Sequence, residues 1–321
     1  MAELGELLVR ERIAPGDLED TVKRVVRQGF DLTSEIPLRA RLLELGPDDS
    51  ALVLVLHHIT ADGASMEPLM RDLGEAYERR RAGFPPQWTE LPVGYADFAM
   101  WQRELVRLAR PQFEYWQHLL DGVPDELALP ADRARPAEPT YRGRSVPLSV
   151  PAEVHEQLIA MARRHGATAF MVLQSAVAAL LSRLGAGADI PLGWPVSGRV
   201  DEALEDLVGF FVNTLVLRAD LAGDPSFEQL LGRVREHVLV AFGNQDVPFE
   251  SVVEQLNPPR VPGRHPLFQV MVASQVGRSA RFGLTGVRSE RIGAGSGSAK
   301  FDLSFQFVEF LDPSEIGRAH V

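Results

Sequence analysis

The spacing of apolar residues changes abruptly between residues 50 and 85. Residues 51–58 form a continuous β-favouring run, ALVLVLHH, which is too short for a buried helix and so predicts an interior strand. From Ser65 onward the apolar residues recur at helical spacing until just before Gly83, which predicts a helix. Asp62 and Gly63 lie between the two elements and are expected to form the turn that joins them.

Strand and helix patterns alternate along the rest of the chain. Residues 95–120 are expected to be helical in two pieces, broken near Pro111. The remaining helices are expected at 152–165, 168–184, 227–242 and 249–256, and strands at 145–150, 189–194, 208–221 and 265–275. Prolines at 124, 130, 136, 139 and 147 exclude a continuous helix or central strand over 121–147, which predicts a linker. The fold class is therefore expected to be α/β or α+β, with an N-terminal lobe over 1–120 and a C-terminal lobe over 148–314.

Composition narrows the class of protein. A chain of 321 residues that is 45% hydrophobic can bury a large core. The net charge of -11 is spread along the chain without a basic block, which argues against a nucleic-acid partner. The absence of cysteine excludes a thiol nucleophile, a disulfide framework and a CxxC zinc site. The N-terminus has no signal-like apolar stretch, and residues 170–181 are shorter than the roughly 20 residues of a membrane span, so we expect a soluble cytoplasmic protein without a membrane partner.

Two adjacent histidines, His57 and His58, end the first predicted strand. Side chains alternate across a strand, so only one of the two can face a given cavity, and alternation does not say which. A neutral imidazole can act as a general base, although a hydrogen-bonded structural histidine fits the same position. A metal site would need a third ligand besides His58 and Asp62, and none is linked to them by a motif.

Asp62 fits a catalytic acid, a ligand or a structural anchor. A buried aspartate stays ionised only beside a cation or backbone donors. Arg199, in the string PVSGR, is a candidate for that cation, and a solvated loop arginine is the alternative.

The string HHITADG, residues 57–63, resembles the HHxxxDG signature of the condensation domains of nonribosomal peptide synthetases. Five further segments follow in the order of that family: YADFAMWQ, PVSGR, VGFFVNTLVLR, NQDVPFESVVEQL and HPLFQVMV. The strings FDLTSEIPLRARL and KFDLSFQF also look like family elements, so the resemblance covers about residues 29–310.

The resemblance implies two lobes related to chloramphenicol acetyltransferase that form a V around a central tunnel. It places His58 at the tunnel and His57 in the packing behind it. It makes Asp62 chiefly structural and pairs it with an arginine, which we place at Arg199.

Two more residues receive roles in this way. Gly63 is expected to let the backbone approach the reacting centre. Asn213 is either a polar group of the tunnel or a residue that ends a strand.

The implied reaction is peptide-bond formation between a donor acyl or peptidyl thioester and the amine of an acceptor aminoacyl thioester. Donor and acceptor peptidyl carrier proteins would carry these substrates on phosphopantetheine, beside a neighbouring adenylation domain. No cofactor or metal is expected on the chain itself. An epimerisation domain and a catalytically silent carrier-binding module of the same superfamily are the alternatives.

The sequence also departs from the family pattern at its two ends. The family's first strand, first helix and RHxxLRT-like segment are absent before the histidines, and the chain stops soon after KFDLSFQF. Both lobes are therefore expected to be incomplete, and the chain alone is expected to be inactive. Residues 315–321, EIGRAHV, match nothing in the family and are expected to be a non-native tail.

Overall fold

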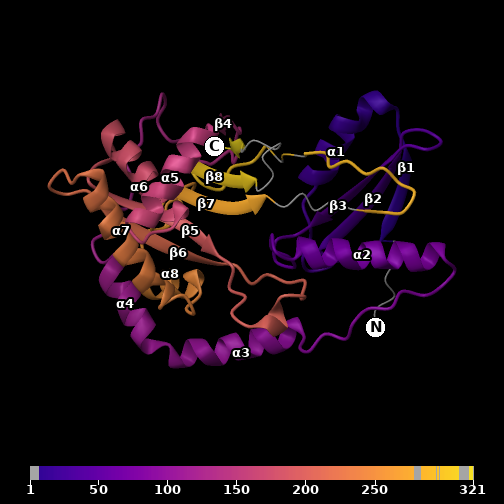
Figure 1. The fold of residues 1–321 in the computed structure, drawn as a ribbon, viewed down its shortest axis with the longest axis horizontal. Coiled ribbons are helices and arrows are strands. Elements are labelled where there is room, and N and C mark those ends of the chain that lie inside the picture. Colours follow the sequence, from indigo (N-terminus) through magenta and orange to yellow (C-terminus); the bar gives the residue numbers. More distant parts are fainter. Residues whose placement is uncertain (1–6, 278–282, 294, 296, 311–317, 321) are drawn as a thin grey trace. The chain divides into compact units, whose positions relative to one another are not determined.

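The computed structural model describes residues 7–277, 283–293, 295, 297–310 and 318–320 (Figure 1). These residues fall into two compact units. The first unit consists of residues 1–98, 199–211 and 280–296, and the second of 99–198, 212–279 and 297–321. The first unit thus includes two segments from the second half of the sequence. The lobe boundaries expected at 120 and 148 stay a prediction.

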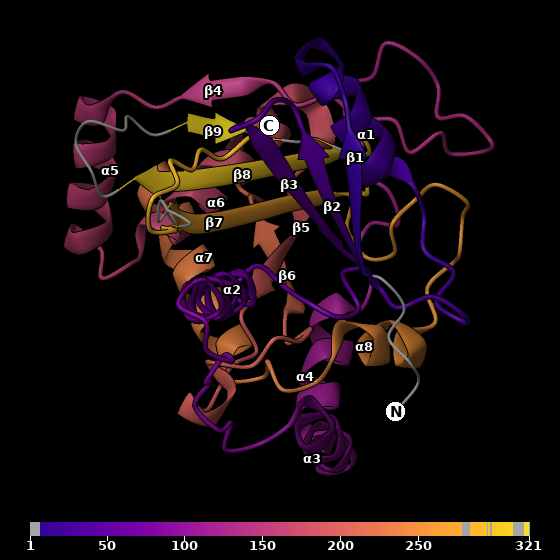
Figure 2. The ribbon, with the colours of Figure 1, turned by 90° about the vertical axis from the view of Figure 1, so that its right-hand side faces the viewer.

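The first unit contains a three-stranded sheet in the order β1 (Leu8–Arg12), β2 (Leu38–Glu44), β3 (Ser50–Leu56) (Figure 2). Strand β1 runs parallel to β2, and β2 runs antiparallel to β3. Helix α1 (Leu18–Arg27), preceded by a 3-10 turn at Pro15–Asp17, packs against β3. Its Val22 and Val25 and the β2 residue Leu43 are the buried apolar residues of these elements.

Helix α2 (Met66–Arg81) follows the turn after β3, where the spacing of apolar residues predicts a helix. Helix α3 (Tyr95–Leu108) begins in the first unit. A small second core in this unit joins Phe98 of α3 to Leu204, Leu207 and Phe211. The segment 199–211, with its short 3-10 helix at Glu202–Leu204, therefore belongs to the packing of the first unit.

The second unit contains a six-stranded sheet in the order β4-β9-β8-β7-β5-β6. Strand β5 lies antiparallel to β6 and parallel to β7, β7 lies parallel to β8, and β9 lies antiparallel to both β8 and β4. The strands are β4 (Pro147–Ser149), β5 (Asp189–Val196), β6 (Asn213–Asp220), β7 (Val270–Gly277), β8 (Leu303–Phe310) and β9 (Arg318–His320). Of the expected non-native tail, 318–320 form β9, and 315–317 and 321 lie outside the described residues.

Helices α6 and α7 pack against each other and against strands β5 and β6, as Figure 1 shows, and enclose the larger core around Trp194. Sequence-encoded caps fix where they begin. The Thr168 hydroxyl accepts a hydrogen bond from the Met171 backbone N–H, and Ser226 and Gln229 cap each other reciprocally. The helices of this unit are α4 (Arg110–Leu120), α5 (Ala152–Arg164), α6 (Ala169–Leu181), α7 (Phe227–Phe242) and α8 (Phe249–Leu256).

Two of the predicted strands begin five residues later in the structure than expected. The strand expected over 208–221 begins only at Asn213, because residues 209 and 211 hydrogen-bond the turn after β3 instead of a neighbouring strand. The strand expected over 265–275 begins at Val270, since Pro266 has no backbone N–H and Leu267 has a φ of 67°.

Among the described residues, one helical segment, 169–186, is long and apolar enough to cross a membrane, with a mean hydropathy of 1.5. It exceeds the segment 170–181 considered from the sequence, because α6 continues into a π-helical turn, Ser182–Ala186. Of this segment, 44% is buried, and its Gln174, Ser175 and Leu181 are almost completely enclosed. Length and composition alone do not make this segment a membrane span. Location in the cytoplasm stays a prediction.

Candidate functional site

The two histidines lie in the turn that follows β3, not on the strand itself. Strand β3 ends at Leu56, and the backbone N–H of His57 makes the next hydrogen bond, to the Pro37 carbonyl at 3.0 Å. The chain then bends, because the N–H and the hydroxyl of Thr60 both donate to the His57 carbonyl. The expected strand alternation therefore does not set the directions of the two imidazoles, and the strand prediction was wrong by two residues.

His57 is half-buried and tied into this turn. Its Nδ1 accepts a hydrogen bond from the Ile59 backbone N–H at 3.1 Å. In the neutral imidazole the proton therefore lies on Nε2. The ring also meets Phe30 edge to face, with ring centroids 6.1 Å apart.

His58, the next residue of the turn, is exposed. Its ring stands edge to face against the half-buried ring of Phe210, with centroids 5.1 Å apart and planes at 89°. The imidazole is thus supported on one side and accessible on another.

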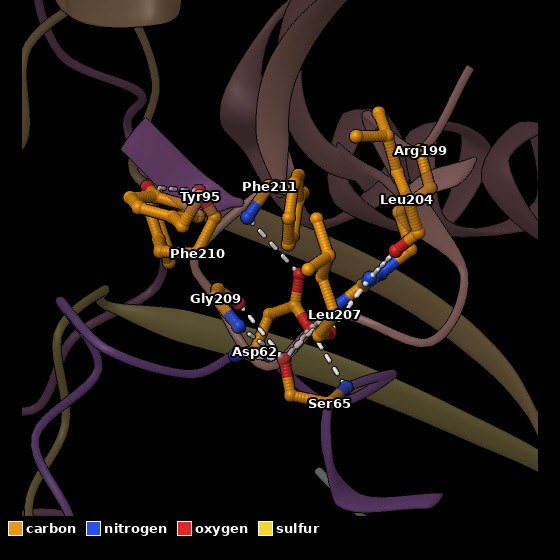
Figure 3. A network of polar contacts seen from close by, with 9 residues as sticks. All are labelled: Asp62, Ser65, Tyr95, Arg199, Leu204, Leu207, Gly209, Phe210 and Phe211. Atoms are coloured by element: carbon orange, nitrogen blue, oxygen red, sulfur yellow. Dashed lines mark hydrogen bonds and ion pairs between the residues drawn. The ribbon is translucent and has the colours of Figure 1, made fainter. Parts of the chain in front are cut away.

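Asp62 holds the turn through a fully buried carboxylate (Figure 3). Its Oδ1 accepts hydrogen bonds from the Ser65 N–H at 2.9 Å and from Nη2 of Arg199 at 3.1 Å, and its Oδ2 accepts one from the Phe211 N–H at 3.1 Å. Burial alone would raise the pKa of Asp62, but the hydrogen bonds from Ser65, Phe211 and Arg199 outweigh it and hold the pKa below its ordinary value. Asp62 is therefore an ionised anchor at neutral pH.

Arg199 supplies the positive charge that Asp62 needs. Its side chain is only 6% exposed. Nη1 donates to the carbonyls of Leu204 and Leu207, and the guanidinium lies 4.1 Å from the ring centroid of Phe211. The segment 199–211 is thus folded around its own arginine, with one edge of the guanidinium turned to Asp62.

Ser65 is a member of this network that the sequence analysis missed. It is fully buried, and its Oγ lies within 2.8–3.1 Å of four groups: Oδ1 of Asp62, Nη2 of Arg199, and the carbonyl and N–H of Gly209. A hydroxyl carries one hydrogen, so it donates to Asp62 or to the Gly209 carbonyl and accepts from the nitrogen donors. Asp62 and Ser65 have the spacing Asp-x-x-Ser just before a helix, which resembles a reciprocal helix cap. This spacing is the signal in the sequence that could have identified Ser65.

Tyr95, the first residue of α3, completes the network. Its hydroxyl donates to the Phe210 carbonyl at 2.8 Å (Figure 3). Its ring lies against Gly209, because a Cβ added there would come within 2.4 Å of Cδ2 of Tyr95. Glycine is therefore required at 209. The string YADFAMWQ pointed to this part of α3 without giving Tyr95 a role.

Two other predicted residues are not part of this network. Gly63 is exposed, and a Cβ added to it meets none of the described atoms within 4 Å, so packing inside the chain does not require a glycine there.

Asn213 belongs to the second unit, and its amide is saturated. Nδ2 donates to the carbonyls of Gln245 and Val247, and Oδ1 accepts from the N–H groups of Thr214 and Phe249. All four hydrogen-bonding capacities of this amide are used to hold the loop before α8. The geometry therefore favours the interpretation of Asn213 as a residue that ends a strand.

Within the described part of the chain, no three histidine, aspartate or glutamate side chains are grouped so that they could hold a metal ion. A pocket of about 380 Å³ lies in the second unit, lined by the end of α4, residues 121–125, the end of α8 and the loop after it. None of the predicted site residues lines this pocket, so the geometry around His58, not the pocket, defines the candidate site.

Known sequences match this chain over nearly its whole length. A family model described as condensation domain matches residues 6–316. The chain is 50% identical, over 94% of its length, to a nonribosomal peptide synthetase of Salinispora arenicola (strain CNS-205), and 49% identical, over 95% of its length, to a dimodular nonribosomal peptide synthase of Bacillus subtilis (strain 168). It spans only 4% and 13% of the lengths of these two relatives.

Comparison with solved structures gives the same fold. The crystal structure of the X-domain from teicoplanin biosynthesis is 33% identical, with a TM-score of 0.90, over 98% of this chain and 73% of that one. A complex of the X-domain and OxyB from teicoplanin biosynthesis matches at 32% identity, also with a TM-score of 0.90, over 98% of this chain and 71% of the other. The condensation domain from the monacolin K polyketide synthase MokA shares the fold at 20% identity and a TM-score of 0.80, over 98% of this chain and 73% of that one.

Proposed function

The chain belongs to the condensation-domain family of nonribosomal peptide synthetases, and we propose that it joins two carrier-bound substrates through an amide bond. Members of this family are in general acyltransferase-type enzymes that work with phosphopantetheine-bearing carrier proteins. The proposed donor is an acyl or peptidyl thioester, and the proposed acceptor is an aminoacyl thioester. Each would be held on its own peptidyl carrier protein, in the cytoplasm, beside an adenylation domain.

The proposed step balances without a metal or an oxidant. The acceptor amine attacks the donor carbonyl carbon, a C–N bond forms, the C–S bond breaks, and the donor thiol leaves on its phosphopantetheine arm. The amine loses one proton and the leaving thiolate gains one. An α-amine with a pKa of about 8 is already partly neutral at pH 7, so orientation of the two reactants supplies a large share of the acceleration.

His58 is the group that we assign to the amine. A neutral imidazole can accept a hydrogen bond from the amine, or take its proton as the tetrahedral intermediate forms. The single observation that supports this assignment is the exposed imidazole of His58, held against Phe210 on a turn that Asp62 anchors.

We assign no proton transfer to Asp62. Its carboxylate is 0% exposed and both of its oxygens accept hydrogen bonds from the chain. Its proposed role is to fix the turn that carries His58. A Cβ added at Gly63 would meet none of the described atoms within 4 Å, and this glycine is proposed to leave room for a reactant at the same turn.

The test uses the full-length synthetase that contains this domain, with both carrier proteins loaded. His58→Ala is expected to abolish formation of the dipeptidyl carrier, measured by intact-protein mass spectrometry. His118→Ala, at an exposed position of α4, is the matched control and is expected to keep the wild-type rate. Wild-type turnover by a folded His58→Ala variant would disprove the assignment.

A silent carrier-binding module is the second candidate, and one observation favours it. The two X-domain structures match this chain with TM-scores of 0.90. One of them is a complex with a second protein, OxyB, and this complex favours a domain that binds a partner protein. In the same assay such a module would bind loaded carriers while wild type and variant alike form no amide. An epimerisation domain would instead exchange the substrate Cα proton with deuterated solvent and form no amide.

A further inference from the structure

We propose that Tyr95 is a positioning residue for His58 and that it acts through the backbone of Phe210. This inference rests on the proposed function, because it explains how the proposed reactive imidazole is held in place.

The orientation of His58 depends on Phe210. The His58 side chain is exposed, and the Phe210 ring stands edge to face against it at 5.1 Å and 89°. An exposed side chain in a turn changes its rotamer freely unless a neighbour restrains it. A displacement of the Phe210 ring therefore changes the directions that the imidazole can take.

The residues on both sides of Phe210 are held by the turn after β3. The Gly209 carbonyl accepts from the Asp62 N–H at 3.0 Å, and the Gly209 N–H donates to Oγ of Ser65 at 3.1 Å. On the other side, the Phe211 N–H donates to Asp62. These bonds fix residues 209 and 211, but none of them engages the Phe210 carbonyl.

Tyr95 holds that remaining carbonyl. Its hydroxyl donates to the Phe210 carbonyl at 2.8 Å, and its ring is wedged against Gly209 and against the Phe211 ring, at a centroid distance of 5.3 Å. Burial raises the pKa of Tyr95, so the phenol stays protonated and keeps donating over the whole neutral range. The Tyr95 side chain thus fills the space beside Gly209 and also holds the peptide that joins Phe210 to Phe211.

The consequence for the reaction is specific. Without the Tyr95 hydroxyl, the planar peptide that joins Phe210 to Phe211 keeps only the Phe211 N–H bond to Asp62. The peptide can then tilt about that one bond, the Phe210 ring moves, and the His58 imidazole is less well directed. Such a change lowers the rate of the bound complex and leaves carrier binding unchanged. It should therefore appear in kcat and not in KM.

The experiment compares Tyr95→Phe with wild type in the full-length synthetase. We expect kcat for dipeptidyl-carrier formation to fall about tenfold, with KM for the loaded acceptor carrier unchanged. In a sample with isotope-labelled histidine, the imidazole NMR signals of His58, assigned by their loss in His58→Ala, are expected to shift because the Phe210 ring has moved. Tyr115→Phe removes the hydroxyl of a half-buried tyrosine in the second unit and is the matched control, with no change expected in either measurement.

The NMR measurement separates this inference from the proposed function, because it needs no turnover. Unchanged His58 signals and an unchanged kcat in Tyr95→Phe would overturn the positioning role, whatever His58 does. Shifted signals together with full turnover by His58→Ala would uphold the positioning and overturn the function. Should Tyr95→Phe fail to fold, Phe210→Leu keeps the backbone bonds and removes the ring, and the same loss of kcat and the same shift are expected.

Discussion

Nη2 of Arg199 donates to the Asp62 carboxylate at 3.1 Å, across 137 positions of the sequence. The two side chains are only 6% and 0% exposed. Removing two charges from water is expensive, and their mutual attraction offsets that cost only when further hydrogen bonds satisfy both groups. Here Asp62 also accepts from two backbone N–H groups and Arg199 also donates from Nη1 to two carbonyls, although Nε of Arg199 is buried without a hydrogen-bond partner.

Arg199→Ala is expected to destabilise the first unit strongly. The change leaves the buried Asp62 carboxylate without its cation, and the free energy of unfolding should fall by about 3–5 kcal/mol. Urea unfolding followed by circular dichroism measures this loss.

The control is an exposed pair in the same unit. Arg71 and Asp206 lie 2.6 Å apart but are 54% and 59% exposed, so Arg71→Ala should cost about 0–1 kcal/mol. Equal losses of unfolding free energy in the two variants would show that burial of the Asp62–Arg199 pair does not increase its contribution to stability.

Ser65→Ala is expected to weaken the same turn by a different route. Loss of the hydroxyl leaves the buried Gly209 N–H without its partner, which should cost about 1–3 kcal/mol. The measurement is again the urea midpoint. Ser175→Ala is the matched control, because Ser175 is equally buried but donates only to the Met171 carbonyl within its own helix. A Ser65→Ala midpoint no lower than that of Ser175→Ala would contradict the role of Ser65 as the centre of the network.

Local patterns predicted most helices of this chain within a residue or two. The break of the helical stretch 95–120 falls at Ala109, just before Pro111, and α7 and α8 have the predicted ends. These features depend on neighbours in the sequence, such as the reciprocal cap of Ser226 and Gln229. Periodicity and capping are sufficient where both partners lie within one turn.

The candidate site could not be predicted to the same degree, because its contacts join distant segments. Ser65 meets Gly209 across 144 positions, and Tyr95 meets Phe210 across 115. Neither contact leaves a periodic signal. The directions of His57 and His58 could not be predicted either, since the strand stops at Leu56, two residues before the end predicted for it.

The Gly63→Ala variant tests whether Gly63 acts in the reaction without contributing to the stability of the fold. An added methyl group meets none of the described atoms within 4 Å, so the unfolding temperature should be unchanged. If Gly63 leaves room for a reactant, the full-length synthetase should nevertheless form less dipeptidyl carrier. Gly193→Ala is the contrasting variant, because its Cβ would come within 2.2 Å of the Phe268 ring and should destabilise the second unit. Full turnover in Gly63→Ala would remove the proposed role of this glycine.

Stability should also fall as the pH is lowered from 8 to 5, because of two half-buried histidines in the second unit. Burial lowers the pKa of both His237 and His265, while Nε2 of His237 donates to the Val216 carbonyl at 3.1 Å. Below the ordinary histidine pKa of about 6.5, these two histidines are protonated in the unfolded chain but stay neutral in the folded chain. The free energy of unfolding therefore decreases as the pH falls from that value toward the lowered pKa values. Protonation of Asp62 causes a separate loss of unfolding free energy at more acidic pH, as the pH falls toward the lowered pKa of this carboxyl group.

Urea midpoints measured between pH 8 and 5 test this origin of the pH dependence. His237→Gln keeps a hydrogen-bond donor for Val216 but does not titrate, so its midpoint should fall less steeply than that of wild type. His118→Gln, at an exposed position, should retain the wild-type slope. A wild-type slope in His237→Gln would mean that this histidine is protonated as easily in the folded chain as in the unfolded one, and that burial beside Val216 does not disfavour its charge.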